Sequence, residues 1–205
     1  DTDLKAPIYI DFGPTSLSAT PWNNITSHQE SSTTSWIKDV ENNYTNIGVR
    51  VLDGFTATHA GVGSEPASPV TVDGVEFPLT AWKDGLLVKG EKNQGDVGPG
   101  RIEISQLDVA RKYNFTILAI RFNGSKDARI SSYKLVGKTE SAVKEVKTGI
   151  KDAASFAAAN FEEYIAKFEN VEPDSEGKVI VEVKGLDTGS AAEGHINALC
   201  ISLAK

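Results

Sequence analysis

Apolar and polar residues alternate with a period of two along most of the chain, and turn residues interrupt this alternation at short intervals. A period of two places successive side chains on opposite faces of a β-strand. Asp53-Gly54, Asp73-Gly74 and Asp84-Gly85 are turn signals that fall between such segments or at their ends. Many short strands with turn punctuation predict an all-β fold, a β-sandwich or jelly roll. The segments that we expect to form strands are 7–13, 46–58, 85–90, 101–105, 113–121, 131–137, 178–185 and 195–203.

Residues 151–171 depart from this alternation. Asp152 is a candidate helix N-cap, alanines follow it, and Phe161, Ile165 and Phe168 recur at helical spacing. Tyr164 and Phe168 also belong to an alternating run, so a hairpin arm that starts near residue 163 is equally allowed. We expect a short helix followed by a strand, with at most one or two short helices in the whole chain.

The composition is that of an ordinary globular domain. The chain has 205 residues, of which 40% are hydrophobic and 24% charged, and we expect one β-sandwich domain over residues 1–205. The net charge of -7 disfavours nucleic acid as a partner, because phosphate binding needs a basic face. No apolar run approaches the roughly 20 residues of a membrane helix, so we expect no membrane insertion, and we expect a monomer.

No catalytic motif is present in the sequence. The three histidines lack the spacing of a zinc site, and there is no G-x-S-x-G motif. The single cysteine, Cys200, lies in an apolar run, so we expect a buried and inert thiol. We assign no catalytic residue and no cofactor. A structural calcium ion remains an expectation with unknown ligands, since sandwiches often bind calcium through loop carbonyls and one or two aspartates.

Acidic residues at loop positions leave an enzyme as an alternative. A glycoside hydrolase needs two carboxylates roughly 5 to 10 Å apart across the sugar, and sequence spacing cannot reveal such a pair. The same residues are equally explained as solvated surface acids. The loop candidates are Asp39, Glu41, Glu65, Asp84 and Asp127.

Tryptophan and asparagine residues supply the ingredients of a sugar site. Sugars combine apolar C–H faces with hydroxyl groups, so their sites combine aromatic rings with amides, carboxylates or guanidinium groups. The sequence "PWNN" offers Trp22, Asn23 and Asn24, and a second tryptophan, Trp82, precedes a charged turn. We predict that these residues bind the ligand. The alternative for each tryptophan is that it covers an edge of the core.

Arg121 completes the predicted ligand-binding set. It ends the strand expected over 113–121, where its guanidinium could pair with Asp11 or Asn197, or could point into a cleft and bind a ligand. Both interpretations stay open on the sequence alone.

The order of several segments resembles a known family. These segments are "YIDFGP…PWNNIT" (9–26), "VLDGFTAT" (51–58), "GRIEISQLDVARKYNFTILAIR" (100–121), "ARISSYKLVG" (128–137), "FENVEPDSEGKVIVEV" (168–183) and "INALCI" (196–201). Together they are similar to jelly-roll modules of the galactose-binding-like type, which accompany SGNH-type esterases and glycoside hydrolases in carbohydrate-degrading bacteria. Gln106 occupies the position of a glycine in this family.

The resemblance implies a non-catalytic carbohydrate-binding module of a protein that is secreted or held on the outer surface of a bacterium. Glycan is the expected partner. One alternative is a glycoside hydrolase or carbohydrate esterase that uses loop carboxylates. Another is a structural or adhesive surface domain that binds no sugar.

Overall fold

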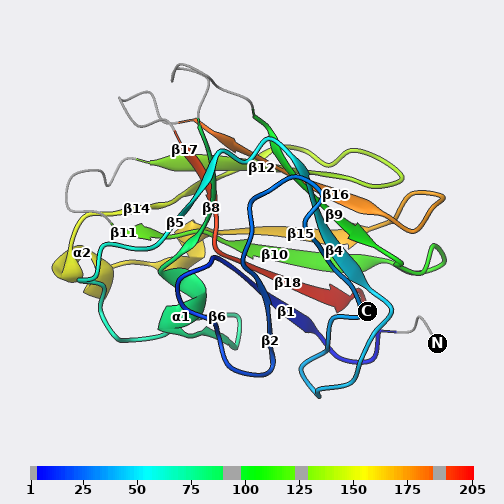
Figure 1. The fold of residues 1–205 in the computed structure, drawn as a ribbon, viewed down its shortest axis with the longest axis horizontal. Helices are drawn as coiled ribbons and strands as arrows, with labels where there is room; N and C mark the ends of the chain where they lie inside the picture. The colour runs from blue at the N-terminus through cyan, green and yellow to red at the C-terminus, as the bar shows by residue number, and fades with distance from the viewer. Residues whose placement is uncertain (1–3, 90–97, 123–128, 187–192) are drawn as a thin grey trace.

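A computed structural model describes residues 4–89, 98–122, 129–186 and 193–205, and Figure 1 shows its β-rich architecture. Two short α-helices, α1 (Leu79–Trp82) and α2 (Ala153–Ala157), and a 3₁₀ helix, η1 (Phe161–Tyr164), accompany the strands. The strands are β1 (Ile8–Phe12), β2 (Trp22–Ile25), β3 (Thr33–Thr34), β4 (Gly48–Asp53), β5 (Ala57–His59), β6 (Val70–Val72), β7 (Val75–Phe77), β8 (Gly85–Lys89), β9 (Gly100–Ser105), β10 (Tyr113–Leu118), β11 (Arg121–Phe122), β12 (Ile130–Val136), β13 (Lys144–Lys147), β14 (Gly149–Ile150), β15 (Ile165–Val171), β16 (Val179–Gly185), β17 (Glu193–Ile196) and β18 (Ala198–Leu203).

Two large sheets form the sandwich. One has the strand order β15-β10-β18-β1-β2, and the other has the order β13-β12-β16-β9-β4-β3. Neighbouring strands are antiparallel, except that β2 runs parallel to β1. A smaller sheet, β17-β8-β5, and the parallel pair β11-β14 extend the fold at one end. The prediction of an all-β sandwich with very few helical turns is therefore confirmed.

Both faces of the five-stranded sheet are buried, and β18 shows how the sequence achieves this. Leu199 and Ile201 belong to the main core, while Ala198 and Cys200 belong to a second apolar cluster on the other face. A strand that is buried on both faces reads as a continuous apolar run instead of an alternating one. The predicted burial of Cys200 is confirmed, and burial raises the pKa of its thiol.

The second cluster is covered by segments that the alternation did not fully reveal. The hairpin of β6 and β7 turns through Asp73-Gly74, where both residues have positive φ, as a tight two-residue hairpin requires. The helix α1 follows this hairpin, and α2 and η1 lie nearby. The order of a short helix and then a strand in residues 151–171 is confirmed, since α2 begins after the Asp152 cap and β15 begins at Ile165.

The strand expected over 113–121 is interrupted. Strand β10 ends at Leu118, and Arg121 starts the short strand β11, which pairs with β14 instead of continuing the sheet. Figure 1 places β11, β14, β5, β8 and β17 on the left, and both ends of the chain on the right. Among the described residues no helix is long and apolar enough to cross a membrane.

Candidate functional site

Trp22 lies on strand β2, half-buried, at the edge of the five-stranded sheet. Its ring centroid is 5.1 Å from that of Tyr9 and 5.7 Å from that of Phe77, in tilted geometries. Tyr9 is its direct neighbour on the parallel strand β1. Trp22 therefore packs over the second apolar cluster and keeps only part of its ring exposed.

The two asparagines after Trp22 use their amides to hold the main chain. Asn23 donates to the carbonyls of Tyr9 (3.0 Å) and Lys38 (2.8 Å) and accepts from Lys38 N–H (2.9 Å). Asn24 accepts from Ser18 N–H (2.8 Å) and donates to the Ser18 carbonyl (3.0 Å). These bonds occupy the amide groups that we predicted would bind a sugar.

Trp82 is fully buried and presents no ring face to a ligand. It stacks on Phe156 at 4.9 Å and donates from Nε1 to the carbonyl of Ser68 (3.1 Å). The sequence-based role of Trp82 as a sugar platform is thus replaced by a core role. The reason is that the α1 segment, which looks like a loop in the sequence, folds over the sheet.

The exposed aromatic rings lie elsewhere, on residues 36–44, which we name the aromatic hairpin. Trp36 is 68% exposed and Tyr44 is 74% exposed. Lys38 and Tyr44 form an isolated β-bridge, and the Lys38 ammonium lies 4.6 Å from the centre of the Tyr44 ring. Trp36 has a φ of 56°, a left-handed backbone conformation that is uncommon for a large side chain.

Asp39 and Asn23 support this hairpin from inside. Asp39 is buried, and its Oδ1 accepts from the main-chain N–H groups of Glu41 (3.0 Å) and Asn43 (2.9 Å). The Asn23 amide bonds to Lys38, described above, tie the hairpin to strand β2. The backbone under the two exposed rings is therefore held in place before any ligand arrives.

Arg121 pairs with neither of the partners that the sequence suggested. Asn197 is instead engaged by the N–H of Ile120 (2.9 Å) and by the carbonyls of Trp82 (2.8 Å), Asp84 (2.6 Å) and Ile120 (3.1 Å). Arg121 lies half-buried in a group with Arg129, His59, His195 and Glu193, which we call the arginine–histidine cluster. The predicted set is therefore divided, because Arg121 is separated from Trp22, Asn23 and Asn24.

Asp11 and Asp84 form a buried carboxyl pair under the loop that begins at Gly13. Asp11 Oδ2 accepts from Ser18 N–H (3.1 Å), and Asp84 Oδ2 accepts from Thr15 N–H (2.8 Å). A Cβ atom on Gly13 would lie 2.5 Å from the Asp84 carboxyl carbon, so only glycine allows this approach. Burial is the main cause that raises the pKa of both carboxyls. Together with a smaller contribution from the charge of Asp84, it raises the pKa of Asp11 to about 7.

The carboxyl pair supplies only part of a calcium site. Each carboxyl keeps one buried oxygen, Oδ1, without a hydrogen-bond partner. Calcium takes 6 to 8 oxygen ligands, and no group of three or more His, Cys, Asp or Glu side chains that could hold a metal is found within the described part of the chain. Two carboxyl oxygens are an incomplete ligand set, so the expected calcium site stays a prediction.

The other loop acids that the structure describes have separate surroundings. Asp39 supports the aromatic hairpin, Glu41 is exposed, and Glu65 accepts from the main-chain N–H groups of Val62 and Gly63. Asp127 lies outside the described residues.

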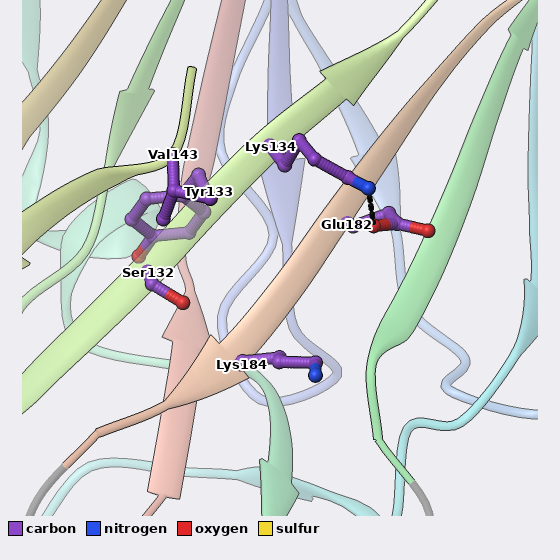
Figure 2. Close-up of a pocket in the computed structure, with 6 residues that line it drawn as sticks. All are labelled: Ser132, Tyr133, Lys134, Val143, Glu182 and Lys184. Carbon is purple, nitrogen blue, oxygen red and sulfur yellow. Dashed lines mark ion pairs between the residues drawn. The ribbon is translucent and has the colours of Figure 1, made fainter. Parts of the chain in front are cut away.

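A shallow pocket on the outer face of the six-stranded sheet lies between β12 and β16 (Figure 2). Lys134 donates to Glu182 at 3.2 Å, and Glu182 also accepts from Arg101 at 3.1 Å. Most charges along this face thus neutralise one another. The residues that line the pocket include no tryptophan, and its one aromatic residue, Tyr133, is buried, so its chemistry is unlike that of a sugar platform.

Comparisons with known proteins describe the fold. No family model matches the chain, and no curated protein matches its sequence. The ectodomain of ANX2 from Arabidopsis thaliana is similar over 97% of this chain, with a TM-score of 0.53 and 8% sequence identity. This chain covers 49% of that structure, so it spans about half of its length.

Two further solved structures are similar more loosely. The CBM36-1 domain of a multidomain xylanase from the hindgut metagenome of Trinervitermes trinervoides has a TM-score of 0.34 and 12% identity, over 78% of this chain and 99% of that one. Truncated AlyQ with CBM32 and alginate lyase domains has a TM-score of 0.32 and 14% identity, over 77% of this chain and 34% of that one. At such identities the similarity concerns the fold alone. The similarity to the ANX2 ectodomain agrees with the β-sandwich that the two large sheets form.

Proposed function

We propose that the chain is a non-catalytic carbohydrate-binding module of a secreted or surface-held bacterial protein, and that it binds glycan at the aromatic hairpin. The observation that supports this proposal is the exposure of Trp36 and Tyr44 on one braced hairpin. Exposed tryptophan is unfavourable in water, and a large side chain in the left-handed region adds backbone strain. A bound ligand would cover the exposed indole ring and would explain why Trp36 keeps this backbone conformation.

The chemistry of the hairpin suits a sugar. An exposed indole ring can stack on the apolar C–H face of a pyranose. The hydroxyl groups around the edge of the pyranose then remain available for hydrogen bonds. The Lys38 ammonium lies over the Tyr44 ring and has three N–H donors. One of them donates to Asn42 Oδ1 (2.9 Å), so another can donate to a sugar hydroxyl. Because the backbone is already held by Asp39 and Asn23, little ordering accompanies binding.

The buried acids lend the hydrolase alternative no support. Asp11 and Asp84 are the described carboxyls that come together with raised pKa values, yet neither is exposed to solvent. A sugar cannot reach them in this conformation.

A glycan-array screen followed by calorimetry tests the proposal. We expect a reproducible hit with the wild-type chain, weakened about tenfold or more by Trp36→Ala, since truncation of a central aromatic contact costs more than 1 kcal/mol. Leu17→Ala is the matched control, because Leu17 is also exposed (61%) but is not part of the hairpin. Trp22→Ala tests whether the residue predicted from the sequence contributes to affinity as much as Trp36 does.

No hit on a broad array by a folded sample would overturn the proposal. So would a hit that Trp36→Ala and Tyr44→Ala leave unchanged. A hit that Trp22→Ala alone abolishes would return the site to strand β2.

A further inference from the structure

The arginine–histidine cluster assembles charged groups from distant parts of the chain at one end of the sandwich. His59 comes from β5, Arg121 from β11, and Glu193 and His195 from β17, while Arg129 directly precedes β12. Main-chain bonds fix the two arginines relative to each other, because Arg121 N–H donates to Thr148 O (2.7 Å) and Thr148 N–H donates to Arg129 O (2.9 Å). Several elements thus hold this cluster rigidly.

Its polar atoms are buried without partners. Within the described part of the chain, Nε and Nη1 of both arginines have no hydrogen-bond partner, and neither do the ring nitrogens of His59 and His195 or Oγ1 of Thr148. The Arg129 side chain is only 4% exposed, and His195 is fully buried. A buried polar group without a partner is destabilising by about 1 to 3 kcal/mol, and more when it is charged. So many such groups in one place mark the cluster as a candidate binding site.

The acids nearby do not satisfy these donors. One Glu193 oxygen lies 3.5 Å from both Arg129 Nη2 and His195 Nε2, which is long for a hydrogen bond. Glu65 also attracts Arg121 through space, but main-chain N–H groups occupy its carboxyl oxygens and it forms no ion pair with Arg121. Arg121 is therefore left without a direct acidic partner among the described residues.

The electrostatics of the cluster favour an added anion. Burial, and then the charge of Arg129, lowers the pKa of Arg121. Burial and the neighbouring His195, Arg121 and Arg129 also lower the pKa of His59, so both histidines are neutral at pH 7. The two guanidinium groups thus repel each other, and Glu193 is the acid that attracts both of them. One further negative charge would relieve their repulsion.

We propose that the arginine–histidine cluster is a binding site for a carboxylate-bearing ligand, which Arg121 contacts first. The planar guanidinium matches the two oxygens of a carboxylate in a bidentate pair. Arg121 and Glu193 are only partly buried, so they mark the route by which a ligand reaches the deeper Arg129. Glu193 excludes more highly charged anions, because its own carboxylate lies in the site.

The site lies far from the aromatic hairpin. In Figure 1 the strands of the cluster are on the left, whereas the hairpin, in light blue, lies at the lower right near the chain ends. Val40 N–H donates to the Pro7 carbonyl (2.8 Å), which places the hairpin beside the N-terminal segment. The carboxylate assignment stands without the proposed function. The choice of a sugar acid as its carrier rests on that function.

Calorimetry with galacturonate, galactose and sulfate at millimolar concentration tests the inference. We expect the folded chain to bind galacturonate and not galactose, which differs by lacking the carboxylate. Arg121→Gln should weaken galacturonate binding about tenfold or more, and Arg121→Lys should also weaken it, because lysine loses the bidentate fork. Arg101→Gln is the matched control, since it removes the same charge from the outer face of the six-stranded sheet. It should leave affinity within about twofold.

Four results would overturn the inference. They are no binding of galacturonate, equal binding of galactose, tighter binding of sulfate, and equal losses in Arg121→Gln and Arg101→Gln. Trp36→Ala separates this inference from the proposed function. It should leave galacturonate binding unchanged, and a loss in this variant would place the sugar acid at the hairpin instead. Failure with galacturonate while the array hit persists would overturn the carboxylate site alone.

Discussion

Replacing Asp11 by Asn should make the protein more stable at pH 8 and should change the pH dependence of its stability. Asp11 lies on the outer face of strand β1, buried beside Asp84. Burial, opposed by the bond from Ser18 and reinforced by the charge of Asp84, raises the pKa of Asp11 to about 7. The folded protein therefore holds this carboxyl in its neutral form below neutral pH, and asparagine imitates that form at every pH.

The magnitude follows from the difference between the folded and unfolded states. Below pH 3.8 the Asp11 carboxyl is protonated in both states, so the stability it provides is fully present. Between pH 3.8 and about 7 the unfolded chain releases the proton and the folded chain keeps it, so the free energy of unfolding falls as pH rises. At about 1.4 kcal/mol for each pKa unit, the loss by pH 8 is about 4 kcal/mol.

Urea unfolding of wild type and Asp11→Asn at pH 4, 6 and 8 measures this effect. The histidines change stability with pH as well, but they do so in both proteins, so the difference between the two isolates Asp11. We expect the variant to gain about 4 kcal/mol relative to wild type between pH 4 and pH 8. Asp152→Asn is the control, because its carboxylate accepts from Ser155 N–H at an exposed helix N-cap, which lowers its pKa.

A difference that stays constant with pH would refute this account of the carboxyl pair. Calcium gives a second test, since carboxylates that bind calcium are ionised. If calcium chloride raised the midpoint of unfolding at pH 8 and removed its pH dependence, the pair would be a cation site, and Asp11→Asn would destabilise the protein.

Substitutions at three further positions test the fold and the bracing of the hairpin. Asn197→Ala should destabilise by about 3 to 5 kcal/mol in urea unfolding, and Asn197→Asp by more, because an acceptor would then face three carbonyls. Gln106→Gly should raise the free energy of unfolding by about 0.5 kcal/mol, because Gln106 is exposed and has a φ of 63°, which glycine adopts without strain. A lower free energy of unfolding in this variant would contradict the reasoning. Asn23→Ala should weaken any array hit in calorimetry and lower stability by about 1 to 3 kcal/mol, although Asn23 touches no ligand; unchanged binding would contradict the bracing role.

The alternation of apolar and polar residues predicted the sandwich because it records burial directly. It also explains the misses. Strand β2 was not predicted because only one residue of "WNNI" is buried, so the segment shows no alternation. It is an edge strand that pairs only with β1 in its sheet. The expected strand over 113–121 breaks after Leu118 because Ile120 N–H bonds to the Asn197 side chain instead of a neighbouring strand. Side-chain interruptions of this kind leave no periodic signal. Gln106, which stands where the similar family has glycine, has a φ of 63°, so the turn keeps a glycine-like backbone without the glycine.

The candidate sites were harder to predict than the fold. A loop tryptophan can be exposed or covered, and the difference is decided by segments far away in sequence. Trp82 is covered by Phe156, 74 positions later, while Trp36 is left open by a polar stretch that binds its own turn through Asp39. The prediction placed Arg121 at the end of a strand, whereas it begins the short strand β11. Its neighbours His59, Arg129 and His195 come from three separate segments. No spacing rule could have joined them.

The "PWNN" stretch has the residue types of a sugar site, but its side chains support the aromatic hairpin and the sheet edge. Trp22 closes the sheet edge over the second apolar cluster, and Asn23 reaches across to the main chain of Lys38. Lys38 in turn lies against the exposed Tyr44 ring. Amides that bond the main chain this fully cannot also bind a sugar without breaking bonds worth about 1 kcal/mol each. A glycan that binds here therefore gains more from the rings that Asn23 holds in place than from Asn23 itself.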